Sequence, residues 1–189
     1  DGLLGDAATG YKVFQSTNGY GFDDGIDITG TQATLSGLTE GGLYFFRVCA
    51  TNDGGQSFPT ETLAVRLPSS GATQALLVNG FDRNNNTLPI WETITNAGHV
   101  CWTNPQNFQT FDYSVQHAFA MHNAGISFDG ASNDAVADND ISLANYQGLF
   151  WICGEESTVN ETFSDTEQAQ VDSFLSTSGN CLFISGAEI

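Results

Sequence analysis

The sequence is short of basic side chains. Its 189 residues include 4 Lys and Arg against 22 Asp and Glu, which gives a formal net charge of −18 at pH 7. A surface of this kind repels phosphate backbones and anionic lipid headgroups. We therefore expect no nucleic-acid partner, and the charge suits a salty exterior in which counterions screen self-repulsion over about 8 Å.

Long apolar runs are also lacking. No stretch approaches the roughly 20 apolar residues of a membrane span, and the N-terminus lacks the basic and apolar regions of a signal peptide. We expect no membrane insertion. A secreted or cell-surface protein is predicted, with any export signal upstream of Asp1.

The cysteines form no C-x-x-C pair, so no zinc ribbon or thioredoxin-like redox site is spelled out. We expect no metal centre and no cofactor, and buried free thiols at most positions. Cys153 and Cys181 sit at opposite ends of neighbouring predicted strands, about 13 Å apart, which is beyond the roughly 7 Å limit for a disulfide. Both should stay reduced, whereas the state of Cys49 and Cys101 is left open.

The first 68 residues carry the patterns of β-strands. Alternating runs with β-branched and aromatic residues, bounded by turn residues, are typical of strands. The runs that fit lie at residues 10–16, 32–35, 38–52 and 61–67. In the longest run, period-two spacing places Tyr44, Phe46, Val48 and Ala50 on one face, which we expect to be the core side.

This region resembles the E-to-F part of fibronectin type III modules. The residues that carry the resemblance are Gly37, Leu38, Tyr44, Phe46, Arg47, Val48, Ala50 and Asn52. It implies a β-sandwich in which the hydroxyl of Tyr44 bonds back to nearby backbone. Only residues 1–9 precede the first strand, so the first two strands of such a sandwich are missing. We expect upstream chain to cover the open face and edge.

Three carboxylates in the first segment offer a calcium alternative. Asp23, Asp24 and Asp27 could supply oxygen ligands, yet their loop lacks the D-x-[DN]-x-[DN]-G order. Solvated loop carboxylates are the competing interpretation. A spacer or adhesion role is the expectation for this segment.

The second segment alternates strands and helices. Apolar runs at residues 75–78, 149–153 and 181–184 each end in a small or polar loop, with a further strand expected at 125–129 and a short irregular or helical stretch at 141–146. A helix is predicted from Tyr113 to Ala124, closing at Gly125. A second helix is predicted to begin at Ser164, which forms a capping box with Glu167. Its apolar stripe consists of Val171, Phe174 and Leu175. The alternation predicts a parallel sheet with helices on its faces.

Polar residues follow these strands and should converge at one edge of the sheet, where ligands of parallel sheets bind. They are Asp82, Arg83, Glu155, Glu156, Ser157, Ser185 and Glu188. Glu155 and Glu156 could hold a cation or, sharing one proton, act as acid and base. Alternatively, neighbours on extended chain point opposite ways and simply solvate or cap a helix.

Five segments of this region together resemble a flavodoxin-like, class I glutamine amidotransferase-like domain. They are L-L-V-N-G-F-D-R, V-Q-H-A, W-I-C-G-E-E-S-T, F-S-D-T-E-Q and L-F-I-S-G-A-E-I. The version that this chain resembles follows a fibronectin type III module in large secreted bacterial proteins labelled xanthan lyase or N-acetylmuramoyl-L-alanine amidase. The implied layout is an incomplete sandwich at 1–68, a linker at 69–74 and the first half of a flavodoxin-like α/β domain at 75–189. The chain ends before the remaining strands that such a domain normally has.

The amidotransferase resemblance places Ser185 where those enzymes carry a nucleophilic cysteine. Phe183 and Ala187 break the G-x-S-x-G elbow around it. A working serine also needs a histidine base within about 3 Å. The candidates are His99, His117 and His122, of which His117 is expected to face the sheet, although a helical histidine is more often structural.

Two functional hypotheses follow. In the first, the chain is a noncatalytic accessory or structural segment of a secreted multidomain protein, positioned near carbohydrate or cell wall and partnered by other parts of the polypeptide or neighbouring subunits. The second is a hydrolase of glycan, peptide-amide or ester substrates at the carboxyl edge of the sheet. A surface-layer or filament subunit is the third alternative.

Overall fold

The computed structural model describes residues 7–71, 74–81, 113–154 and 162–186, together with the backbone of residues 90–94 and 98–102. The strands are β1 (Gly10–Ser16), β2 (Ile26–Ile28), β3 (Leu43–Asn52), β4 (Gly55–Gln56), β5 (Leu63–Arg66), β6 (Ala75–Asn79), β7 (Ile90–Ile94), β8 (Gly98–Trp102), β9 (Phe128–Ser132), β10 (Gly148–Gly154) and β11 (Cys181–Gly186). The helices are α2 (Tyr113–Asn123), α3 (Asn133–Ala137), α4 (Asp165–Leu175) and the 3-10 turn η1 (Leu143–Asn145).

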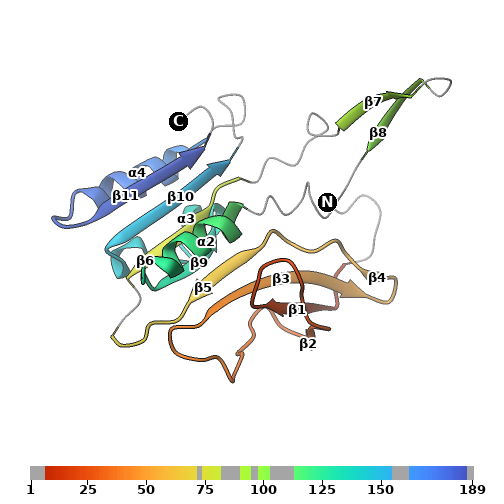
Figure 1. Ribbon diagram of the computed structural model, residues 1–189, viewed down its shortest axis with the longest axis horizontal. Coiled ribbons are helices and arrows are strands. Elements are labelled where there is room, and N and C mark those ends of the chain that lie inside the picture. Colours follow the sequence, from red (N-terminus) through yellow and green to blue (C-terminus); the bar gives the residue numbers. More distant parts are fainter. Residues whose placement is uncertain are drawn as a thin grey trace.

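Most strands belong to one mixed sheet of nine strands in the order β11-β10-β6-β9-β5-β3-β1-β2, with β4 paired to β3 (Figure 1). Its antiparallel and parallel parts meet where Arg66 of β5 pairs with Phe128 of β9. Strands β7 and β8 form a separate antiparallel hairpin. A mixed and partly parallel sheet with helices is thus confirmed, while the division into a β-sandwich and an α/β domain stays a prediction.

The parallel part consists of β9, β6, β10 and β11. Leu76 lies opposite Leu149, and Phe150 lies opposite Phe183, so the three predicted apolar runs lie side by side in one direction. All five residues of β6 are buried. A strand covered on both faces needs apolar side chains on both, which explains its unbroken apolar run.

Helices cover the two faces of the parallel strands differently. The cluster under α2 contains Leu43, Phe45, Ala64, Ala75, Leu77, Val115, Ala118, Met121, Phe128 and Ile152. The cluster under α3, η1 and α4 contains Leu76, Val78, Ala131, Val136, Leu143, Tyr146, Leu149, Trp151, Cys153 and Phe174. Because the first set includes residues of β3 and β5, one hydrophobic core crosses from the parallel to the antiparallel strands.

The expected core face of β3 is buried only at Tyr44, and the opposite face is the better covered one. Phe45 and Cys49 are buried, whereas Phe46 and Val48 on the predicted face are only partly buried. The reason is that period-two spacing separates the two faces of a strand without showing which one is covered. Helix α2 packs on the Phe45 face, where the rings of Phe45 and Phe119 lie 5.5 Å apart.

Tyr44 makes the backbone contact that the fibronectin resemblance implies. Its hydroxyl accepts a hydrogen bond of 2.8 Å from the amide of Thr39, and this bond lowers the pKa of Tyr44 because it stabilises the phenolate. Gly42 is required beside the ring, since a Cβ there would stand 2.7 Å from a Tyr44 ring carbon.

Both long helices begin and end close to the predicted residues. Helix α2 spans Tyr113–Asn123, and Gly125 follows with a φ of 78°. Ser164 and Glu167 form the complete capping box of α4. On the predicted stripe of α4, Phe174 is buried and Val171 partly buried, but Leu175 is 45% exposed. No helix in the described part of the chain is long and apolar enough to span a membrane.

Several strand positions differ from expectation. Residues 32–35 form no strand, and β2 lies instead at Ile26–Ile28. The second parallel strand begins at Phe128 rather than at Gly125. The β7–β8 hairpin was not predicted. Short strands take their pairing from tertiary neighbours, so their bounds are weakly marked in the local sequence.

The expected free thiols are found where the structure describes the sulfur. No disulfide joins Cys49, Cys153 and Cys181 within the described part of the chain, and Cys49 and Cys153 are buried as expected, whereas Cys181 is exposed. Cys181 pairs with Gly148 at the start of β10, while Cys153 lies near its end, which keeps the two thiols apart. Burial raises the pKa of the Cys49 thiol.

Candidate functional site

The candidate site lies on the α2 side of β11, near the carboxyl end of the parallel strands. Of the sequence-predicted site residues, Ser185 and His117 lie in the described part of the chain. The others, together with the side chain of His99, lie outside the described residues; they are Asp82, Arg83, Glu155, Glu156, Ser157 and Glu188. The predicted convergence of all seven polar residues therefore stays a prediction.

Ser185 is the fifth residue of β11 and is half-buried. It pairs in register with Ile152 of β10, a member of the cluster under α2. Since directly paired strand residues point to the same face of a sheet, its side chain is directed toward α2. Ser185 therefore lies within a strand, not on the sharp turn that holds the nucleophile in the amidotransferase family.

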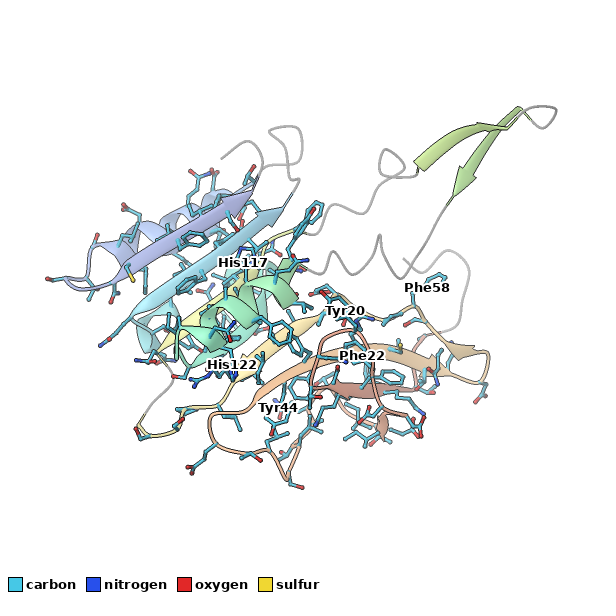
Figure 2. The ribbon with its side chains drawn as sticks, in the orientation of Figure 1. Tyr20, Phe22, Tyr44, Phe58, His117 and His122 are labelled. Atoms are coloured by element: carbon cyan, nitrogen blue, oxygen red, sulfur yellow. The ribbon has the colours of Figure 1, made fainter. Side chains whose placement is uncertain are left out.

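His117 lies in the middle of α2 (Figure 2). Its Nε2 atom lies 2.8 Å from the Oγ of Ser185. Its Nδ1 atom lies 2.7 Å from the carbonyl oxygen of Tyr113, one helical turn earlier. The ring is thus held at both nitrogens, by the helix itself on one side and by β11 on the other.

These two contacts decide the tautomer of His117. A carbonyl oxygen can only accept, so Nδ1 must carry the proton that bonds to Tyr113. In the neutral ring Nε2 is then unprotonated and accepts the hydrogen bond that the Ser185 hydroxyl donates. The lone pair of the imidazole therefore points at the serine proton, which is the arrangement that a general base for a serine nucleophile needs.

The orienting group in this arrangement is a backbone carbonyl. In a serine–histidine–aspartate triad, a carboxylate holds Nδ1–H and also stabilises the imidazolium that forms during reaction. The Tyr113 carbonyl supplies the same orientation with only a partial negative charge. We therefore expect the orientation of His117 to be retained and the stabilisation of its cationic form to be weaker than in such a triad.

An apolar groove begins at the His117 ring. It has a volume of about 440 Å³ and is lined by Gln116, His117, Ala120, Met121, Ala124, Ile126, Phe150 and Phe183. The rings of Phe150 and Phe183 lie 5.7 Å apart along its floor, and Phe183 is 50% exposed. The groove therefore places uncharged, partly solvent-exposed surface directly beside the serine–histidine pair.

Asn79 is a polar residue near this edge that the sequence did not single out. It ends β6, is 4% exposed, and its Oδ1 atom is buried without a hydrogen-bond partner among the residues that the structure describes. Asn79 pairs with Ile152, which in turn pairs with Ser185, so the two side chains lie on one face about 10 Å apart. The sequence offered one signal for this residue, because Asn79 is the polar residue that ends the otherwise apolar strand β6.

The remaining polar groups of interest have structural partners. Arg66 Nε donates to Nδ1 of His122 over 3.1 Å, which separates His122 from the serine. The carboxylate of Asp23 accepts hydrogen bonds from the amides of Gln15 and Gly25, and Asp27 pairs with Lys12 at 3.4 Å. Among the described residues no group of three or more His, Cys, Asp or Glu side chains is arranged to hold a metal ion.

Comparison with known proteins gives no family. No protein-family model matches the chain, and no curated protein matches it. Among solved structures, the twitchin kinase region from C. elegans (Fn31-NL-kin-CRD-Ig26) aligns with 51% of this chain and 15% of its own length, at 23% identity and a TM-score of 0.32. This chain spans a small part of that protein, and a similarity this weak carries no inference about function.

Proposed function

We propose that the chain carries a serine-dependent acyl-hydrolase site in which Ser185 is the nucleophile and His117 its base. One observation supports the proposal above all. The Ser185 Oγ lies 2.8 Å from Nε2 of His117, and Nδ1 of the same ring lies 2.7 Å from the Tyr113 carbonyl oxygen. Nucleophile, base and orienting group thus stand in the order that activates a serine.

The proposed reaction is hydrolysis of an ester through an acyl-serine. Ser185 Oγ attacks the carbonyl carbon while its proton passes to His117 Nε2. The tetrahedral intermediate collapses, the bond to the alcohol oxygen breaks, and the alcohol leaves with the proton from His117. Water, deprotonated by His117, then attacks the acyl carbon, and release of the carboxylic acid returns the proton to Ser185.

A fluorophosphonate probe tests the nucleophile. We expect covalent labelling of the protein at Ser185, found by peptide mass mapping, and loss of the label in Ser185→Ala. The control is Ser132→Ala, because Ser132 ends β9, another parallel strand of the same sheet, at the same edge; this variant should label like the original. Equal labelling of S185A, or silence of the unchanged protein with an intact thermal transition, would count against the proposal.

A second candidate function is supported by a groove with both polar and apolar lining residues on the opposite side of the sheet. This groove of about 860 Å³ is lined by Asn139, Ile141, Ser142, Leu143, Ala144, Asp165, Thr166, Ala169, Gln170, Ser173, Phe174, Thr177 and Asn180. Its hydroxyl and amide groups can both donate and accept hydrogen bonds, as recognition of a sugar requires. In this alternative the chain is a noncatalytic accessory segment of a secreted, cell-surface protein, held near carbohydrate.

Affinity electrophoresis in gels containing cell-wall polysaccharide tests the alternative. Ala169 is exposed and lines the groove, so Ala169→Trp should fill it and abolish any retardation. Leu175 is exposed on the same helix outside the lining, so Leu175→Trp should leave retardation unchanged. Retardation that both variants retain would remove the groove from this function.

A further inference from the structure

The groove beside His117 is lined mainly by apolar side chains. Its lining includes four apolar side chains, Met121, Ile126, Phe150 and Phe183. It also includes two alanines, Ala120 on α2 and Ala124 directly after the end of that helix. Small side chains on the helix leave space above the Phe150 and Phe183 rings. An exposed phenylalanine on a strand beside such space is a surface that an apolar group would bury favourably.

The lack of charged side chains in the groove narrows the class of ligand that it can hold. The chain carries a formal net charge of −18, yet no Asp, Glu, Lys or Arg lines this groove. An anionic or sugar-like group would lose hydration there without gaining a partner, whereas a hydrocarbon chain needs none. Because His117 both lines the groove and lies 2.8 Å from Ser185, a chain in the groove would bring its attached carbonyl carbon to the serine.

We infer that the substrate class is an ester with a medium-length apolar acyl chain, which lies between α2 and the Phe150–Phe183 pair. This inference rests on the proposed acyl-hydrolase function. It predicts chain-length selectivity, since each buried methylene favours the longer acyl group. It also separates the roles of the residues: Ser185 and His117 react, while Ala120, Phe150 and Phe183 select the acyl chain.

The test compares hydrolysis of p-nitrophenyl octanoate with that of p-nitrophenyl acetate by the full chain and two variants. Ala120 is exposed and lines the groove, so Ala120→Trp fills it without disturbing the core. Asn123 is exposed on the same helix and does not line it, so Asn123→Trp is the matched control. We expect kcat/KM to be about tenfold or more higher for octanoate, a preference lost in A120W and kept in N123W.

A binding measurement separates the groove from the chemistry. N-phenyl-1-naphthylamine is an uncharged apolar fluorophore, so the acidic surface does not repel it. We expect the S185A protein to bind this probe, octan-1-ol to displace it, and A120W to weaken binding at least about fivefold relative to N123W. Hydrolysis without chain-length preference, or equal probe binding by A120W and N123W, overturns the acyl-groove inference alone. Absence of hydrolysis by a folded protein that binds the probe overturns the proposed function, and the ester assignment falls with it.

Discussion

The two sides of the parallel strands differ in how their polar groups are used. On the α4 side, Ser164 and Glu167 exchange the hydrogen bonds of a capping box, and the Tyr146 hydroxyl donates to Asp129 over 2.9 Å, although Oε1 of Glu167 and Nε1 of Trp151 are buried without a partner among the described residues. On the α2 side, the Ser185–His117 pair stands beside an open apolar groove. The hydrogen bonds named on the α4 side hold structural elements in place. On the α2 side, the proposed nucleophile and base lie next to the groove lined by Phe150 and Phe183.

The largest effect expected from this comparison is on reactivity at the α2 side. His117→Ala should slow fluorophosphonate labelling of Ser185 by two to four orders of magnitude, the usual contribution of a general base (about 10²–10⁴). The rate of labelling at several probe concentrations measures this. His122→Ala is the control, because His122 is held by Arg66 and lies away from the serine; slowing by both variants alike would indicate a structural effect only.

Core packing provides the second test. Trp151 is fully buried on the α4 side, its ring 4.8 Å from that of Phe163. Trp151→Ala should lower the free energy of unfolding by about 3–5 kcal/mol, measured by urea denaturation. Phe183→Ala on the open α2 side should cost less than about 1 kcal/mol, because half of that side chain is already exposed. Equal losses would contradict the claim that the side chain of Trp151 is packed in the core while that of Phe183 borders an open groove.

The hydrogen bond between Tyr146 and Asp129 should show in both stability and pH dependence. Burial, and then the bond to the Asp129 carboxylate, raise the pKa of Tyr146 above its ordinary value of 10.0. The folded state therefore holds the phenol proton more tightly than the unfolded state. Its contribution is fully present below about pH 10 and is lost as the pH rises above that value.

Tyr146→Phe should accordingly cost about 1.5 kcal/mol at neutral pH, the order expected for a hydrogen bond to a charged group. It should also flatten the fall in stability above pH 10. Urea midpoints between pH 7 and pH 11 measure both effects. Tyr20→Phe is the control because that side chain is 60% exposed; an alkaline fall that persists unchanged in Y146F would mean that another group titrates.

The smallest effect concerns the start of α4. Ser164→Ala removes the side chain that accepts from the Glu167 amide, and it should lower the free energy of unfolding by about 1 kcal/mol. Ser173→Ala, at an exposed position within the same helix, should change stability little, since alanine is the better helix former. Guanidinium denaturation of the two variants is compared with that of the unchanged protein. The comparison distinguishes the loss of a helix cap from a general effect of replacing serine by alanine in this helix.

Much of the parallel part could be predicted from the residues alone. The apolar runs around Leu76, Phe150 and Phe183, the end of α2 before Gly125 and the box at Ser164 are local signals, each produced within a few neighbouring residues. The bounds of β2 and β9 and the β7–β8 hairpin were missed because short strands depend on distant partners. The covered face of β3 was missed for the same reason, since α2 lies far away in the sequence.

The candidate site also has features that local sequence predicts and features that depend on distant parts of the chain. Ser185 could be named from its place after an apolar run, and His117 from its place on a helix expected to face the sheet. The sequence showed only that a serine nucleophile would need a histidine nearby. The 2.8 Å contact between the two side chains depends on how α2 packs on the sheet. Asn79 was missed because nothing in its neighbours shows that its oxygen is buried without a partner among the described residues.

The sequence by itself determined which segments become strands and helices in the parallel part, and it determined the acidic charge of the whole chain. Those properties depend on composition and on side-chain spacing over a few residues. Only the tertiary structure decided which face of each strand is covered, which nitrogen of His117 meets Ser185 and where a groove is left open. These depend on where α2 comes to lie on a sheet whose strands are brought together from distant parts of the chain.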